Sequence, residues 1–293
     1  MTTAVNKTEK MLVYDGDCPM CTSTVAFMLR AKLLRPEQAR ANYDLSPAEL
    51  ESARAAGIRN QLVVFDPETG ETRSGADALR WIVADNTNNH VLVRVWGLPG
   101  FRNLLRWGYE NISYNRRIIS PPRQRIVCDC EPDVTLARRL SLAIPLVAIA
   151  AGLAAAFGAA LFHRWSFGDP LSGAILMEVA TGSGWLALAL ATFVSLRSPE
   201  RVDYLAHLAV TMFVGAIVLV PGGLLALFLS PTAALAIGGL SALASFALMF
   251  LMQGRRVKAV GISGRWLWGW VVAVPLGFAL AVYIYDHFWR ALG

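Results

Sequence analysis

Residues 11–21 read MLVYDGDCPMC, a short apolar run that leads directly into two cysteines with two residues between them. The run Met11–Tyr14 is typical of a short buried strand. Pro19 suits the first position of a helix, because its missing backbone N–H would have had no partner there. The stretch therefore predicts a strand-to-helix turn that places Cys18 at the start of a helix and Cys21 one turn along the same face.

Strand and helix patterns continue to alternate up to about residue 120. Residues 62–65 form a second apolar run, and a turn sequence follows it at residues 66–70. Ser74-Gly75 and Pro99-Gly100 then mark the starts of two further helices. Strands that alternate with helices indicate an α/β domain, which we place at residues 11–120 after a flexible N-terminus at residues 1–10.

The helix that begins at Pro99 has an amphipathic pattern. Apolar side chains, including Phe101 and Leu104, recur on one face, whereas Arg102 and Arg106 lie off that face. Together with Trp107, these apolar side chains could line the core of the domain or touch a membrane. We expect them to line the core.

The composition of the whole chain excludes an ordinary soluble protein, a disordered chain and a small disulfide-stapled secreted domain. Of the 293 residues 55% are hydrophobic and only 16% are charged, against about 25% charged in soluble domains. Residues 1–139 hold 19 Lys or Arg and 16 Asp or Glu, whereas residues 140–293 hold 8 and 5. A charged N-terminal domain therefore precedes an apolar C-terminal half.

The apolar half contains five stretches long enough to cross a hydrocarbon core, which needs about 20 apolar residues of helix. They predict an all-α bundle of about five spans at residues 140–293. Because Pro221-Gly222-Gly223 interrupts the third stretch, residues 204–220 could already cross, so four or six spans are alternatives. The five stretches are residues 140–162, 171–196, 204–229, 232–253 and 266–287.

Basic residues gather at alternate ends of these stretches. Arg138 and Arg139 precede the first, Arg197 and Arg201 separate the second from the third, and residues 254–265 carry four more basic residues. The positive-inside rule then predicts a multi-pass protein of the inner cell membrane, with a cytoplasmic N-terminal domain and the C-terminus outside. The excess of Lys and Arg in residues 94–139 favours anionic lipid headgroups over nucleic acid as its partner.

The two cysteines at the first turn are the strongest chemical signal. A thiolate is the reactive form of cysteine, and the unpaired N–H groups at a helix start favour that form at Cys18. Cys21 lies within reach to resolve a mixed disulfide. Asp15 and Asp17 act against a thiolate, and Asp15 could also take a proton from Cys21. Half a zinc site and two packed thiols are the alternatives.

A second pair, Cys128 and Cys130, lies in a basic juxtamembrane linker that we place at residues 121–139. Four cysteines in a cytoplasmic chain are not expected to be structural disulfides. Cys128 or Cys130 could resolve or shuttle a disulfide for the first pair, or both could be free thiols in a linker. Alternatively, all four cysteines could hold zinc or copper(I), which thiolates select.

The apolar half contains no cysteine, so its own side chains cannot relay a dithiol across the bilayer. If reducing equivalents cross the bilayer, a quinone, another cofactor or a membrane protein partner would have to carry them. Nothing in the sequence requires such a carrier. Glu178 lies inside the second span near Thr181 and Ser183, and a carboxylate there is a candidate functional group. His207, near the start of the third span and close to Asp203, is a second possible polar site, and its side chain could extend toward the interface.

The N-terminal half resembles the DCC-type thiol-disulfide oxidoreductases over about residues 11–133. Asp15, Cys18 and Cys21 match the family's Asp-x-x-Cys-x-x-Cys signature. Ser74 with residues 76–80, residues 96–117, and Cys130 with Pro132 are similar to its later segments. The resemblance implies a thioredoxin-like fold and dithiol–disulfide exchange. Thioredoxins have a cis-proline before the third strand, but Arg59-Asn60-Gln61 stands here, which puts the usual main-chain docking of substrate in question.

These observations predict a membrane-anchored thiol-disulfide oxidoreductase with a thioredoxin-like domain. Cys18 attacks or receives the disulfide, Cys21 resolves it and Asp15 tunes or transfers protons. The reaction requires no cofactor beyond this dithiol, and its substrate is a thiol or disulfide of a protein or small molecule. The alternative is a protein that handles copper or zinc through its cysteines, or a scaffold, with a membrane domain for transport or assembly.

Overall fold

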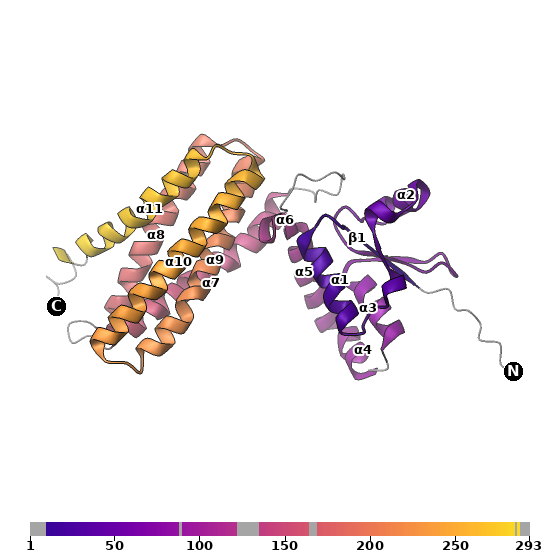
Figure 1. Cartoon of the computed structure of the whole chain (residues 1–293), viewed down its shortest axis with the longest axis horizontal. Coiled ribbons are helices and arrows are strands. Elements are labelled where there is room, and N and C mark those ends of the chain that lie inside the picture. The colour runs from indigo at the N-terminus through magenta and orange to yellow at the C-terminus, as the bar shows by residue number, and fades with distance from the viewer. Residues whose placement is uncertain (1–9, 88–89, 122–134, 164–168, 285, 288–293) are drawn as a thin grey trace. The chain divides into compact units, whose positions relative to one another are not determined.

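The computed structural model describes residues 10–87, 90–121, 135–163, 169–284 and 286–287 (Figure 1). The chain divides into two compact units, Met1–Arg138 and Arg139–Gly293. The first unit contains the sheet and the cysteine turn, and the second contains long apolar helices. We describe each unit by itself.

A mixed four-stranded sheet organises the first unit. Its strand order is β2-β1-β3-β4, with β2 parallel to β1 and the other neighbouring strands antiparallel. Leu12 pairs with Val64 and Val13 with Val63, so that the two central strands carry apolar side chains on both faces. The strands are β1 (Met11–Tyr14), β2 (Ala39–Ala41), β3 (Val63–Phe65) and β4 (Thr72–Ser74).

Helices cover both faces of this sheet. Side chains of α1 (Pro19–Arg30) and α3 (Gly75–Asn86) pack with Leu12 and Val64 on one face. On the other face, Ala53 of α2 (Pro47–Ala55) packs with Val13 and Val63. The order β1-α1-β2-α2-β3-β4-α3 is that of a thioredoxin-like fold, which confirms the predicted fold class. Short 3-10 turns occupy Pro36–Gln38 and Asn42–Asp44.

Three further helices, α4 (His90–Gly97), α5 (Pro99–Tyr114) and α6 (Arg116–Ile119), complete the unit. On α5, Arg102 and Arg106 face the domain, where both bind the Asp77 carboxylate of α3. The apolar side of α5 faces outward. Our prediction that Phe101, Leu104 and Trp107 line the core is therefore wrong, because all three side chains are exposed in the described structure.

In the part of the chain that the structure describes, five helices of the second unit are long and apolar enough to cross a membrane. This confirms the prediction of five spans, and the chain is a multi-pass membrane protein. Helix α9 packs along α10, and α8 packs along α11 (Figure 1). The five helices are α7 (Leu136–Phe162), α8 (Pro170–Ser195), α9 (Glu200–Ala226), α10 (Pro231–Val260) and α11 (Arg265–Ile284).

Two of these helices differ from the expected spans. Helix α9 continues through Pro221, so the interruption expected there does not occur. Helix α10 runs to Val260, which places Arg255, Arg256 and Lys258 inside the helix rather than in a connecting segment. A helix can continue past the hydrocarbon core into the interface, where its own hydrogen bonds still satisfy the backbone, so a change in side-chain polarity does not mark its end.

Small residues bring the helices of the second unit close together. A Cβ atom built on Gly158 of α7 would lie 2.2 Å from the carbonyl oxygen of Gly173 on α8. Such approaches are typical of membrane helices, where close packing replaces the hydrophobic effect as the source of association. The apolar core of the unit is built around Trp270, together with Leu188, Tyr204, Leu208 and Val257.

Candidate functional site

The two cysteines lie where the sequence predicts them, at the start of α1. Cys18 is the N-cap residue, with extended backbone angles, and Pro19 follows at the first helical position. The Thr22 N–H donates to the Cys18 carbonyl oxygen at 3.0 Å and so closes the first helical turn. Cys18 is buried and Cys21 is partly buried, and both are free thiols. The helix geometry therefore holds the two sulfur atoms on one side of its first turn.

The two thiols have opposite electrostatic environments. The hydrogen bond from the Cys21 thiol is the largest influence on Cys18, and it lowers the pKa of Cys18 to about 6 even though burial acts in the opposite direction. The Cys18 side chain accepts no N-cap hydrogen bond. The backbone amide of Cys21 also lowers the pKa of Cys18, but by less than the Cys21 thiol does. The same thiol–thiol hydrogen bond raises the pKa of Cys21. Near neutral pH the pair therefore holds one thiolate and one thiol.

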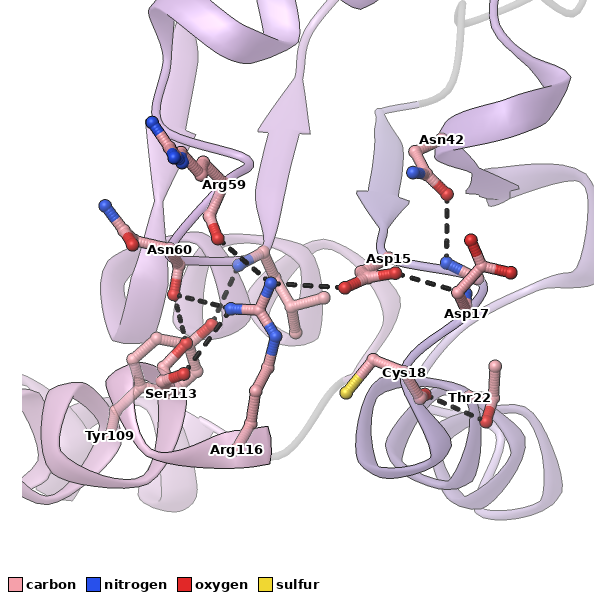
Figure 2. Close-up of polar contacts among 12 residues, drawn as sticks. Asp15, Asp17, Cys18, Thr22, Asn42, Arg59, Asn60, Tyr109, Ser113 and Arg116 are labelled. Carbon is pink, nitrogen blue, oxygen red and sulfur yellow. Dashed lines mark hydrogen bonds and ion pairs between the residues drawn. The ribbon is translucent and has the colours of Figure 1, made fainter. Parts of the chain in front are cut away.

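The turn before the cysteines is fixed by hydrogen bonds to its backbone. The Asp17 N–H donates to Asp15 Oδ1 at 3.1 Å, and the Gly16 N–H donates to Asn42 Oδ1 at 3.0 Å (Figure 2). A Cβ atom on Gly16 would lie 2.3 Å from the Tyr43 ring, so a larger residue here would require that ring to move. The Asp15 carboxylate is consequently held next to the cysteine turn.

Arg116 lies on the opposite side of the site from the cysteines and faces Asp15. Its Nη2 lies 3.2 Å from Asp15 Oδ2, and both side chains are almost completely buried. Figure 2 shows the guanidinium between this carboxylate and the loop at residues 59–60, with the Cys18 sulfur directed toward the same side. The positive charge of Arg116 also helps to lower the pKa of Cys18, whereas the charge of Asp15 raises it.

The same guanidinium binds the loop that leads into β3. Arg116 Nη2 donates to the Arg59 carbonyl oxygen at 2.9 Å, and Nη1 donates to the Asn60 carbonyl oxygen at 3.2 Å. Thioredoxins carry their cis-proline in this loop. In this chain the domain's own Arg116 occupies two backbone carbonyls there, so those acceptors already have a partner.

Helix α5 supplies two more contacts to this loop. The Ser113 hydroxyl donates to the Asn60 carbonyl oxygen, and the Tyr109 hydroxyl accepts the Leu62 N–H at 2.9 Å. Burial raises the pKa of Tyr109 to about 12, so the phenol remains protonated at neutral pH. Arg116, Tyr109 and Ser113 therefore hold the loop opposite the cysteines in one position.

Sequence reasoning did not assign a role to Arg116, Tyr109 or Ser113. All three lie within residues 96–117, which were noted only for their likeness to a family segment. The sequence did not indicate that Arg116 pairs with Asp15, because the two residues are 101 positions apart. A buried carboxylate does require a cation or several donors, so the position of Asp15 directly after a predicted buried strand could have prompted the search.

The second cysteine pair and the metal alternative cannot be placed. Cys128 and Cys130 lie outside the described residues. Within the part of the chain that the structure describes, no group of three or more His, Cys, Asp or Glu side chains is arranged to hold a metal ion. The described cysteines, Cys18 and Cys21, therefore form no such group by themselves.

Glu178 lies in α8 and is partly buried. Its Oε1 has no hydrogen-bond partner among the described residues. Thr181 and Ser183 do not approach it through hydrogen bonds, because their hydroxyls donate to the Met177 and Val179 carbonyl oxygens of the same helix. The structure therefore does not join the three polar residues into one site.

The His207 side chain does not extend toward the interface. Its side chain is buried in α9, and its Nδ1 lies 2.8 Å from Arg256 Nη1 on α10. Asp203, its expected neighbour, instead binds Arg139 Nε at 2.7 Å. Helix packing gives His207 a polar partner inside the bundle. A buried imidazole with such a partner does not have to reach the water interface to form a hydrogen bond.

The topology and the Cys-x-x-Cys pair at the start of α1 define a thioredoxin-like domain. Residues 12–120 match the model of the DCC1-like thiol-disulfide oxidoreductase family, so this part of the chain is a domain of that family. It is followed by the five candidate membrane-spanning helices. No curated protein and no solved structure shows a significant match to the chain.

Proposed function

We propose that the protein is a membrane-anchored dithiol–disulfide oxidoreductase, in which Cys18 is the nucleophile and Cys21 is the resolving thiol. The observation that carries this proposal is the polarised pair at the start of α1. A pKa of about 6 makes Cys18 mostly thiolate at neutral pH, while Cys21 remains a thiol that can act in the second step. The family match supports the same chemistry.

In the reducing direction, the Cys18 thiolate attacks one sulfur of a substrate disulfide. A bond forms between Cys18 and that sulfur, and the other substrate sulfur leaves as a thiolate. Cys21 then loses its proton and attacks Cys18, which releases the second substrate thiolate and forms the Cys18–Cys21 disulfide. Two electrons pass from the dithiol to the substrate. The reverse sequence oxidises a substrate dithiol, and neither direction needs a further cofactor.

Arg116 and Asp15 tune this pair in opposite directions. The guanidinium stabilises negative charge on Cys18, and the carboxylate opposes it while holding the guanidinium in place. Asp15 is also the candidate acceptor of the Cys21 proton in the second step. An Asp15→Asn variant separates the two roles, because a tuning role predicts a more acidic Cys18, whereas a proton-acceptor role predicts slower release of the trapped substrate.

The proposal places the domain on the cytoplasmic face of the inner membrane. Its support is the distribution of basic residues, since Arg138 and Arg139 lie at the start of α7, and Arg197 and Arg201 lie around the connection from α8 to α9. A membrane-impermeant thiol reagent applied to cells from outside should leave Cys18 unmodified until the membrane is opened. Modification before opening would reverse the orientation.

A trapping experiment tests the catalytic assignment. Cys21→Ser removes the resolving thiol, so the full-length variant should accumulate a mixed disulfide through Cys18 in cells. Of this pair the matched Cys18→Ser variant retains only Cys21, whose burial still raises the pKa of its thiol, and it should trap little. Equal trapping by the two variants, or no trapping together with stoichiometric metal in the wild-type protein, would overturn the assignment in favour of metal handling.

The pH dependence of the reduction potential provides an independent test. Below about pH 6 both thiols carry protons, so reduction takes up two protons for two electrons. Above that pH only the Cys21 thiol carries a proton, so reduction takes up one proton for two electrons. The potential should therefore fall by about 59 mV per pH unit in acid and about 30 mV per pH unit near neutrality. A slope that stays at the larger value up to pH 8 would contradict a stabilised thiolate.

A further inference from the structure

Helix α5 is oriented with its polar side inward. Arg102 and Arg106 bind Asp77 of α3, and Tyr109 and Ser113 bind the loop before β3. These four positions lie on one side of the helix, as their three- and four-residue spacing requires. In a soluble domain the side of a surface helix that faces the body is normally apolar. Here the polar side has that position.

Among the described residues of the first unit, none covers the apolar side of α5. Phe101, Leu104 and Trp107 follow each other at three-residue intervals and share the face opposite Arg102 and Arg106. Their exposed fractions are 41%, 59% and 54%, respectively. We call these three residues the α5 outer face. Val95 of α4 and Leu98, which directly precedes α5, are also exposed. Clustered large apolar side chains at a surface indicate an interaction site.

The chain itself tethers the first unit to a bilayer. The first candidate membrane span begins at Leu136, only a short stretch after α5 ends at Tyr114. Tethering makes the encounter of the domain with the membrane an intramolecular event, which raises its effective concentration. A cytosolic protein partner or a second copy of the chain would have no such advantage.

The chemistry of α5 and its surroundings also fits a membrane interface. Trp and Phe are the side chains that favour the boundary between headgroups and hydrocarbon, and Leu adds apolar area. Arg94 on α4 is exposed, and the side chains of Arg102 and Arg106 remain partly exposed beside Asp77. Arg94, Arg102 and Arg106 against Asp77 leave the region around α5 with a net positive charge, which suits anionic headgroups.

We infer that the α5 outer face docks onto the lipid bilayer, with Phe101, Leu104 and Trp107 inserted at the interface. The inference goes beyond the thiol chemistry and does not depend on it. Because α5 also carries Tyr109 and Ser113 on its inner side, docking would fix the orientation of the cysteine site relative to the membrane surface. The domain would then act on thiols or disulfides located near that surface.

A photo-crosslinking experiment on the full-length protein tests this inference. The photoreactive residue p-benzoylphenylalanine replaces Leu104, in nanodiscs that contain both zwitterionic and anionic lipid. Glu51 of α2, which is exposed on the opposite side of the sheet, is the matched control position. We expect lipid adducts at position 104 and none at position 51. Adducts at position 104 to a second copy or to another part of the protein, or equal lipid labelling at both positions, would overturn the inference.

Spin labels give a second measurement that does not depend on crosslinking yield. In a background with the four cysteines replaced by serine, a nitroxide at position 104 should collide more often with oxygen than with a water-soluble nickel complex. The label at position 51 should show the opposite preference. A label at position 104 that behaves like the one at position 51, or that is shielded from both reagents, would contradict docking on lipid.

Charge substitutions then test the same face in the native-cysteine chain. Leu104→Glu combined with Trp107→Glu should abolish lipid crosslinking from a probe at position 101. Asn103→Glu, which adds charge at an exposed polar position of the same helix, should retain it. The reaction of Cys18 with a small soluble disulfide should remain unchanged in both variants, which shows that the domain is folded. Retained crosslinking in the double variant would overturn the inference.

Discussion

Arg116 and Arg256 are both almost completely buried, one in each unit, but their surroundings differ. Arg116 faces the Asp15 carboxylate and lies close enough to the cysteine pair to change the pKa of Cys18. Arg256 contacts the imidazole of His207, and one turn earlier on α10 Gln253 binds the hydroxyls of Tyr204 and Thr211 on α9.

The difference shows that a buried cation acquires a chemical role from its neighbours. Near Arg116 are groups that gain or lose negative charge, so its field changes the reactivity of a nucleophile. The named neighbours of Arg256 are polar groups on the adjacent helix, and the apolar half of the chain contains no cysteine. We therefore interpret the Arg256 cluster as polar contacts that join α9 to α10.

The largest effect is expected from separating the charges of Asp15 and Arg116. Arg116→Met leaves a buried carboxylate without its cation and should destabilise the first unit by about 3–5 kcal/mol. Hydrogen exchange at the amides of β1 and β3 in the full-length protein measures this loss.

The double variant Asp15→Asn/Arg116→Met provides the control for that prediction. Removing both charges also removes the penalty of an unmatched buried ion, so the double variant should be destabilised by less than the sum of the two single changes. If the losses in the free energy of unfolding were additive, the Asp15–Arg116 ion pair would not be what stabilises the first unit.

His207→Leu should have a smaller effect, confined to the second unit. It removes the acceptor at Nδ1 from the Arg256 guanidinium and should cost about 1–3 kcal/mol. Exchange of the α9 and α10 amides measures it. Thr192→Val is the matched comparison, since its hydroxyl binds only a carbonyl of its own helix. If His207→Leu altered the reactivity of Cys18, the assignment of the two arginines to separate roles would fail.

The pH dependence of Cys18 alkylation tests the role of Arg116 directly. In the wild type the rate should rise through about pH 6 and level off near neutrality, because the thiolate reacts. Arg116→Met should slow alkylation at pH 6 by about five- to tenfold, since the thiolate loses a nearby positive charge.

Arg116→Lys distinguishes charge from shape at the same position. Lysine retains the positive charge but lacks the planar fork that reaches Asp15 and two backbone carbonyls. Its alkylation rate should fall between those of the wild type and Arg116→Met. A rate equal to the wild type would show that charge alone matters, and an unchanged rate in Arg116→Met would exclude Arg116 from tuning Cys18.

The smallest effect is expected at a partly exposed pairing. Asp77→Asn disrupts the ion pairs with Arg102 and Arg106, where water screens the charges. The unfolding midpoint of the first unit should change little, and the alkylation of Cys18 should not change. A loss as large as that of Arg116→Met would remove the distinction between buried and exposed arginines.

Much of the fold could be predicted from local patterns. The strand at Met11–Tyr14, the helix start at Cys18 and the five spans all follow from apolar runs and helix-start residues. Strands β2 and β4 escaped detection because, unlike the equally short β3, they contain no run of large apolar residues. Helix α2 was also missed, although Ser46 and Glu49 form a capping box that marks its start.

The candidate site could be predicted only in part. The cysteines and Asp15 lie within seven residues of sequence, so the turn geometry brings them together. The loop at residues 59–62 and the side chains of Tyr109 and Arg116 come from distant segments. Their meeting depends on how α5 and α6 pack, which no local pattern records.

The sequence by itself determined the position of the sulfur pair at a helix start, an α/β N-terminal domain and the five apolar spans, because these depend on the spacing of neighbouring residues. The thioredoxin-like class followed from the resemblance to the DCC-type family. Only the tertiary structure decided that Arg116 faces Asp15, that α5 presents its apolar side outward and that His207 is buried against Arg256. Each of these depends on which element packs against which. The cost of burying an unmatched charge or polar group selects among such packings, and it acts between residues far apart in the chain.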